Sequence, residues 1–72
     1  MITHHPIKPA WTCRGCAGEW PCHTRRRELR AEYERAPVSL AIYLAAQLVD
    51  AVQDLAHVPA GHLHYRFLGW TR

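Results

Sequence analysis

The residues best suited to chemistry are three cysteines that lie within ten positions of one another. Cys13 and Cys16 form a Cys-x-x-Cys pair around Gly15, and Cys22 follows shortly after. Such a pair places two thiolates on one metal ion because a tight turn points both sulfurs the same way. Gly15 suits this turn because glycine adopts a positive φ at little cost. An odd number of cysteines cannot form a closed set of disulfides, so the pattern predicts a zinc site with Cys13, Cys16 and Cys22 as ligands.

A histidine is expected as the fourth ligand, and the sequence offers several. His4 and His5 stand eight or nine residues before Cys13, on a segment that can loop back onto the cysteines at about 3.3 Å per residue. The proline after His5 restricts the backbone of that residue. His23 adjoins Cys22, and neighbouring side chains rarely reach one tetrahedral ion comfortably. We therefore favour His4, followed by His5 and then His23.

Other chemistry of these residues fits less well. The cysteines could be free buried thiols and the histidines solvated. A thioredoxin-type redox pair is disfavoured because no strand is predicted before the pair and no helix begins at it. Three thiolates also make a poor Lewis acid, and the sequence lacks the His-x-Glu signature of the zinc deaminases. We predict a structural metal and no catalytic residues.

Length and composition favour one small domain that needs a metal or a partner. The chain has 72 residues, six histidines and a formal net charge of +3. Chains of this size bury a limited fraction of their surface. The first residues carry no apolar leader, so a cytoplasmic location with reduced cysteines is expected. The mild positive charge permits a nucleic-acid partner without requiring one.

The elements that must position the site begin with extended chain. Two prolines within residues 1–12, and Trp20-Pro21 before Cys22, bias the preceding residues away from helix. We therefore expect residues 1–23 to form an arm and a metal knuckle, the knuckle being the segment that holds the cysteines. The helices follow within residues 24–72, which makes the expected fold class mainly α.

Three helices are predicted, over about 24–36, 39–57 and 59–68. Thr24 and Ser39 are suited to cap the first two, a proline ends or kinks the first, and a proline begins the third. The second is the strongest prediction, since alanine and leucine dominate it and it contains no glycine or proline.

This second helix is apolar around most of its circumference, with its polar residues on one narrow line. Two short neighbouring helices offer too few large apolar side chains to cover it, and a remainder of this kind marks interfaces. Polar residues interrupt the run before it reaches bilayer length, so no membrane span is expected. We predict contact with a protein partner, or a homodimer, through four residues: Leu44, Leu48, Val52 and Leu55. The alternative is that the knuckle, with Trp11 and Trp20, covers this side and leaves a monomer.

Three consecutive arginines, Arg25, Arg26 and Arg27, stand at a predicted helix start, where the macrodipole already presents positive charge. They could offset the net negative charge of a zinc ion with three thiolates, grip a phosphate backbone, or form a solvated turn. Arg26 lies about one helical turn past Cys22, which favours the first explanation. Acidic residues further along the same helix argue against extended contact with DNA.

The chain also resembles a group of small actinobacterial zinc-finger-like proteins. The resemblance covers nearly the whole length and rests on these motifs: His4-x-Pro6-x-x-Pro9-x-Trp11-x-Cys13-x-x-Cys16, Trp20-Pro21-Cys22, Arg26, Leu29 and Leu63-x-x-Arg66-Phe67-Leu68-Gly69-Trp70. It implies His4 as the fourth ligand. Members are often labelled flavin reductase, which implies a flavin-related enzyme.

We expect a non-enzymatic zinc-finger-like binding module that acts through protein contacts or self-association. The second hypothesis is a small DNA-binding transcriptional regulator that uses Arg25, Arg26 and Arg27. The flavin-related enzyme ranks third, because the sequence has no Gly-rich phosphate loop and no strand–loop–helix unit.

Overall fold

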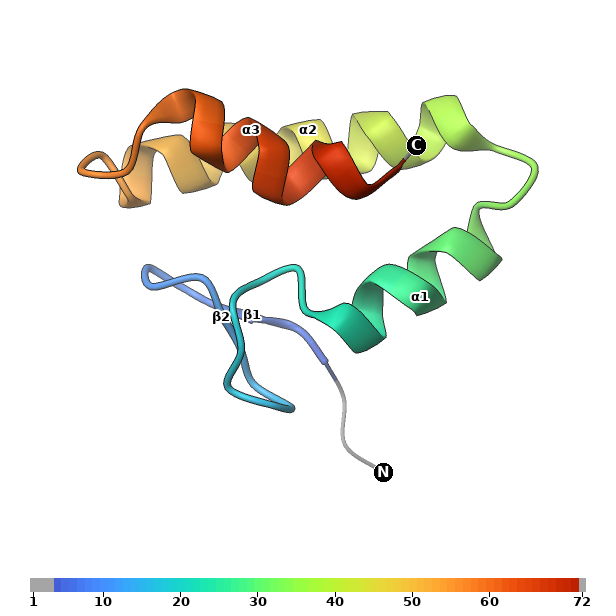
Figure 1. Ribbon diagram of the computed structural model, residues 1–72, viewed down its shortest axis with the longest axis horizontal. Helices are drawn as coiled ribbons and strands as arrows, with labels where there is room; N and C mark the ends of the chain where they lie inside the picture. Colours follow the sequence, from blue (N-terminus) through green and yellow to red (C-terminus); the bar gives the residue numbers. More distant parts are fainter. Residues whose placement is uncertain (1–3, 72) are drawn as a thin grey trace.

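Two short strands and three α-helices follow one another in the computed structural model, which describes residues 4–71 (Figure 1). The elements in chain order are β1 (Pro6–Ile7), β2 (Thr12–Cys13), α1 (His23–Glu32), α2 (Pro37–Asp54), α3 (Ala60–Leu68) and a closing 3-10 turn, η1 (Gly69–Thr71). The predicted mainly α fold, with three helices after an N-terminal extended region, is confirmed. In the part of the chain that the structure describes, no helix has the combination of length and apolar character needed to cross a membrane.

The extended arm doubles back on itself as an antiparallel pair, which the sequence did not predict. Pro6 lies opposite Cys13 in β1 and β2, and a single bridge joins Thr12 to Glu19. The left-handed backbone expected at Gly15 occurs instead at Ala17, whose φ is 62°. The turn therefore closes one residue beyond the Cys-x-x-Cys pair.

Helix α1 begins at His23 because Cys22 caps it. The Cys22 sulfur accepts a hydrogen bond from the backbone N–H of Arg25 at 3.4 Å. The prediction of Thr24 as the N-cap is therefore wrong: an acceptor two residues earlier satisfies the free N–H groups of the first turn. The helix also ends at Glu32, short of the predicted residue 36.

Helix α2 begins at Pro37, two residues before the predicted cap at Ser39. Proline suits this first helical position because its missing N–H would have no partner there and its φ is already helical. The proline expected to end the first helix thus begins the second. The helix ends at Asp54 rather than residue 57.

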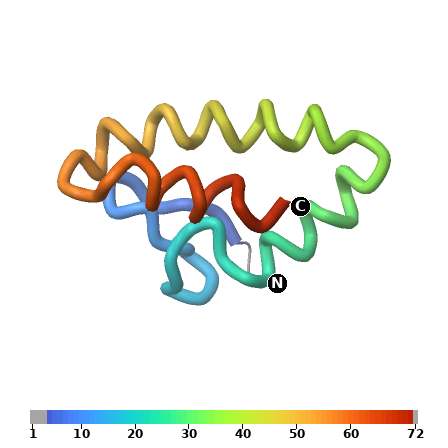
Figure 2. Tube along the Cα trace, turned by 45° about the horizontal axis from the view of Figure 1, so that its top comes forward, coloured from blue at the N-terminus to red at the C-terminus, as the bar shows by residue number. Residues whose placement is uncertain are grey.

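Helices α2 and α3 run side by side in opposite directions, and the strands and α1 lie on one side of this pair (Figures 1 and 2). Helix α3 follows Pro59, which caps it, and turns its buried residues Leu63, Arg66 and Phe67 toward the arm. The buried Trp11 ring meets Phe67 edge-on, with ring centroids 5.5 Å apart.

The two tryptophans of the N-terminal region pack in the core between the arm and the helices. Trp11 and Trp20 are almost fully buried. Their indole N–H groups reach polar side chains of α2: that of Trp11 donates to Asp54 at 2.8 Å, and that of Trp20 donates to Gln47 at 3.0 Å. The arm therefore covers much of the apolar face of α2.

This packing overturns part of the predicted interface. Leu44 is buried in one core cluster of the chain. Leu55 is buried in a second cluster, against which Leu48 packs. Of the four predicted residues, Val52 alone is exposed, at 39%. Trp11 and Trp20 cover Leu55, as the alternative prediction expected of this side of the helix. Leu44 is instead buried against Leu29 of α1.

Arg66 holds the arm to α3 from within the core. Its side chain is 8% exposed. Nε donates to the carbonyl oxygen of Trp20 and Nη2 to that of Trp11, both at 2.6 Å, and Glu19 lies 3.6 Å from Nη1. Burial lowers the pKa of Arg66, and the Glu19 carboxylate opposes this change. The planar guanidinium of Arg66 thus links α3 to the backbone at Trp11 and at Trp20.

Replacing Arg66 tests this clamp. Arg66→Met should lower the free energy of unfolding by about 2 to 3 kcal/mol, because two buried carbonyl oxygens lose a charged donor. Arg66→Lys keeps the charge but not the two-pronged geometry and should lose part of this. Urea unfolding of the metal-loaded protein, followed by circular dichroism, measures both. An equal effect of Arg35→Met, at an exposed position, would contradict the clamp.

Candidate metal centre

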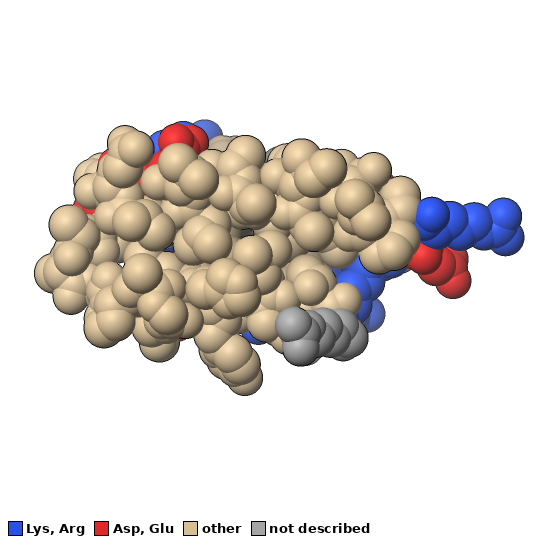
Figure 3. All heavy atoms as spheres, turned by 90° about the horizontal axis from the view of Figure 1, so that it is seen from above, with Lys and Arg blue, Asp and Glu red and all other residues tan. Residues whose placement is uncertain are grey.

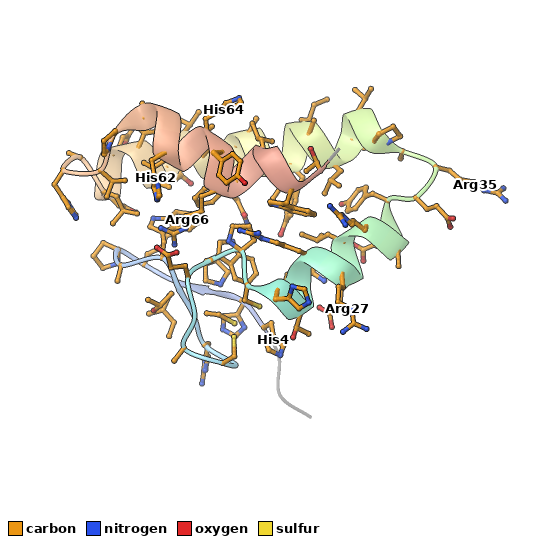
Figure 4. The ribbon with its side chains drawn as sticks, viewed as in Figure 1. His4, Arg27, Arg35, His62, His64 and Arg66 are labelled. Atoms are coloured by element: carbon orange, nitrogen blue, oxygen red, sulfur yellow. The ribbon has the colours of Figure 1, made fainter. Side chains whose placement is uncertain are left out.

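The four residues predicted as metal ligands converge in space. The ligand atoms of His4, Cys13, Cys16 and Cys22 all lie within 4.8 Å of one another. The Nδ1 atom of His4 is 3.2 Å from the Cys13 sulfur and 3.3 Å from the Cys22 sulfur. His4 lies beside the first turn of α1 (Figure 4). The cluster can hold a metal ion.

Separate pieces of backbone bring these ligands together. The β1–β2 pairing returns the arm to Cys13, and the backbone N–H of Arg14 donates to the carbonyl oxygen of His5 at 2.9 Å. A turn closed by the Ala17 N–H on the Cys13 carbonyl, at 2.8 Å, carries Cys16 back toward Cys13. Cys22 arrives last, as the cap of α1. The site therefore joins the arm, the turn and the first helix.

The four residues differ in their exposure. Cys13 and Cys22 are buried, whereas Cys16 is exposed. Backbone N–H groups point at both buried sulfurs: Gly15 donates to Cys13 at 3.3 Å and Arg25 to Cys22 at 3.4 Å. Such donors stabilise thiolates, as they do in structural metal sites.

The two buried thiols differ in their acidity. Burial raises the pKa of Cys13, but hydrogen bonds from the backbone of Cys16 and Gly15 outweigh it and lower this pKa to about 6. Burial raises the pKa of Cys22 to about 11, and the neighbouring Cys13 charge adds to the rise. One thiolate is therefore stable here and a second is not, unless a cation neutralises them. A metal ion held by these residues would supply that charge and favour the thiolate form of Cys22.

The donor set fits a tetrahedral ion. Metal–sulfur and metal–nitrogen distances of about 2.3 and 2.1 Å place tetrahedral ligands roughly 3.5 to 3.8 Å apart. The separations of the His4 nitrogen from the two buried sulfurs are close to this range. His5 and His23, the other candidates for fourth ligand, are not part of the cluster. His62 and His64 lie far from it on α3 (Figure 4).

The three consecutive arginines do not act on the sulfurs as a group. The Arg25 side chain pairs with Glu28 at 3.3 Å, and only its backbone N–H serves Cys22. Arg26 turns inward, where Nε donates to the carbonyl oxygen of Pro21 at 2.9 Å and Nη2 to that of Arg66 at 3.2 Å. In residues 4–71, no arginine side chain donates to a cysteine sulfur. Backbone carbonyl groups hold the Arg26 guanidinium, and that its charge offsets the thiolates stays a prediction.

The sequence did not predict a role for Arg66, which donates to the carbonyl oxygens of Trp11 and Trp20. A signal was present: Arg66 lies three residues after Leu63 and directly before Phe67, on the apolar side of its helix. A charge at that place predicts a buried, paired guanidinium.

Comparisons with protein-family models, with curated proteins and with solved structures gave no match to this chain. The assignment of the site therefore depends on its own geometry and chemistry.

Single substitutions of the three candidate histidines test which one completes the site. His4→Ala should reduce bound metal well below one ion per chain, because its nitrogen lies among the three sulfurs. His5→Ala and His23→Ala serve as matched controls and should keep the full content. Metal analysis of the purified proteins by atomic emission measures this. Retention by His4→Ala together with loss in either control would show that a different histidine is the ligand.

Proposed function

We propose that this protein is a zinc-stabilised, non-catalytic binding module that works by self-association. The observation that supports it most directly is the set of four protein ligands. Four ligands close a tetrahedral site, whereas catalytic zinc keeps one position open for water or substrate. Three thiolates and one imidazole favour zinc among the common divalent ions. In this proposal the ion holds the fold, and the surface carries the function.

The surface that favours association is the outer side of α2. Its apolar residues follow one another at alternating intervals of four and three: Val38, Ile42, Ala45, Val49 and Val52. This is the spacing of a helix that packs along a second helix. Val38, Ile42 and Val49 are 71%, 67% and 59% exposed, so no part of the described chain covers them.

A second copy of this chain suits that surface. Over α2 and α3 the molecule shows an almost uncharged face, with charged side chains confined to its margins (Figure 3). Two such faces meet without repulsion, although the chain carries a net charge of +3. An anionic membrane or nucleic acid would instead favour a basic face.

A groove lies between α2 and the C-terminal helix and turn. Its volume is about 440 Å³, and it lies beside the stripe, lined by Ala41, His64, Tyr65, Leu68, Gly69 and Thr71. In a two-fold dimer each copy presents the same patch, so projecting residues of one copy can enter the groove of the other. Tyr65, which is 74% exposed, is a large projecting side chain that lines this groove.

Removal of the metal should unfold the domain. Structural zinc supplies on the order of 10 to 16 kcal/mol in small finger peptides, more than a core of this size provides. Chelation should therefore abolish the cooperative thermal transition seen by circular dichroism, and added zinc should restore it. Cys16→Ser is the sharpest variant, because Cys16 is exposed and adds little to the core. An unchanged transition in the metal-free protein would rule out a structural role.

Sedimentation equilibrium at micromolar concentration tests self-association. The wild-type protein should form a dimer, and Val49→Glu should return it to a monomer because a buried, unpaired charge is costly at an interface. Gln53→Glu adds the same charge to α2 outside the stripe and should leave the dimer intact. Zinc content should stay the same in both variants. A wild-type protein that remains monomeric would refute the self-association part and leave the metal proposal standing.

A further inference from the structure

A second pocket, separate from the metal ligands, lies between α1 and the C-terminal turn. Its volume is about 180 Å³, and its lining residues are His23, Arg26, Arg27, Arg30 and Trp70. The first four follow helical spacing, so they share one face of α1. Trp70 comes from η1 and closes the other side.

Two of the arginines are held in place. The Arg26 and Arg30 guanidinium groups each lie 5.7 Å from the centre of the Trp70 ring. Arg30 also donates to the carbonyl oxygen of Trp70, and Arg26 to that of Pro21. Groups fixed in this way lose little conformational entropy when they bind a ligand.

The positive charge of the pocket is not balanced locally. Among the described residues that line it, none is acidic. Helix α1 adds the positive end of its dipole, since the pocket includes its first residue. The indole nitrogen of Trp70 is buried and makes no hydrogen bond within the described residues. Three guanidinium groups and the Trp70 ring therefore line a space whose described lining includes no carboxylate.

We propose that this pocket binds a phosphate-type oxyanion, either free or as the terminal group of a small phosphorylated molecule. Guanidinium groups match the oxygens of such an anion with paired, charge-assisted hydrogen bonds. The volume accommodates a single phosphate group and is smaller than the 300 to 1,000 Å³ or so of pockets that enclose larger ligands. The pocket shares no residue with the proposed dimer face or with the four metal ligands.

The test uses the zinc-loaded protein and inorganic phosphate, at constant ionic strength with chloride as the reference anion. The indole N–H resonance of Trp70 in NMR spectra reports the site, because those of Trp11 and Trp20 are bonded to α2. We expect saturable shifts of this resonance. Arg27→Ala should weaken phosphate binding roughly ten-fold or more, since an ionic hydrogen bond is lost. Arg27 is exposed and its side chain makes no hydrogen bond within residues 4–71, so this variant should fold normally.

Arg35→Ala is the matched control. Arg35 projects away from the molecule beyond α1 (Figure 4), so its loss should change phosphate affinity less than two-fold, as a change of general charge would. Equal weakening by both variants, or shifts that do not saturate, would overturn the proposal. Tighter binding of a phosphorylated sugar than of free phosphate, lost in Arg27→Ala, would support it and identify a small molecule as the source. Binding of duplex DNA without binding of inorganic phosphate would overturn it in favour of an extended nucleic-acid surface.

Discussion

The fold depends on the convergence of three sulfurs and one imidazole at a single point. Cys13 and Cys22 are buried close together; hydrogen bonds lower the pKa of Cys13, whereas burial and the neighbouring Cys13 raise that of Cys22. A bound ion would turn this repulsion into attraction. Because the ligands come from the arm, the turn and the cap of α1, the ion would fix the order of the first third of the chain, where regular backbone pairing is sparse.

The helices depend on that region through two tryptophans. Trp11 and Trp20 each contact both helices of the α2–α3 pair. Their indole N–H groups donate to α2, and their carbonyl oxygens accept from Arg66 on α3. The arm is therefore part of the core between two helices and not an appendage to it. Loss of order at the metal would free both rings and expose the apolar face of α2. This coupling explains how so short a chain can stabilise an 18-residue helix that is apolar over most of its surface.

The sequence was sufficient for features that depend on short spacings. The Cys-x-x-Cys pair, the third cysteine and an arm long enough to return were enough to predict the four clustered residues. Helix boundaries were harder to predict, because several residues near a helix start are suited to cap it. Cys22 caps α1 in place of Thr24, and α2 begins at Pro37, two residues before Ser39. The burial of Leu55 depends on Trp11 and Trp20, and that of Leu44 depends on Leu29 of α1, so no pattern within α2 could reveal either.

The three consecutive arginines, Arg25, Arg26 and Arg27, also have surroundings that the sequence did not reveal. Each residue of an α-helix is turned by about 100° from the one before, so neighbours in sequence diverge in space. Arg25 pairs with Glu28, Arg26 lines the pocket while donating to the Pro21 carbonyl oxygen, and Arg27 lines the pocket with no hydrogen bond among the described residues. The three arginines therefore do not form one free basic patch, which weakens the case for a regulator that binds DNA with all three. The basic residues that do share one pocket are spaced along one face of α1, and Trp70, from the other end of the chain, completes its lining.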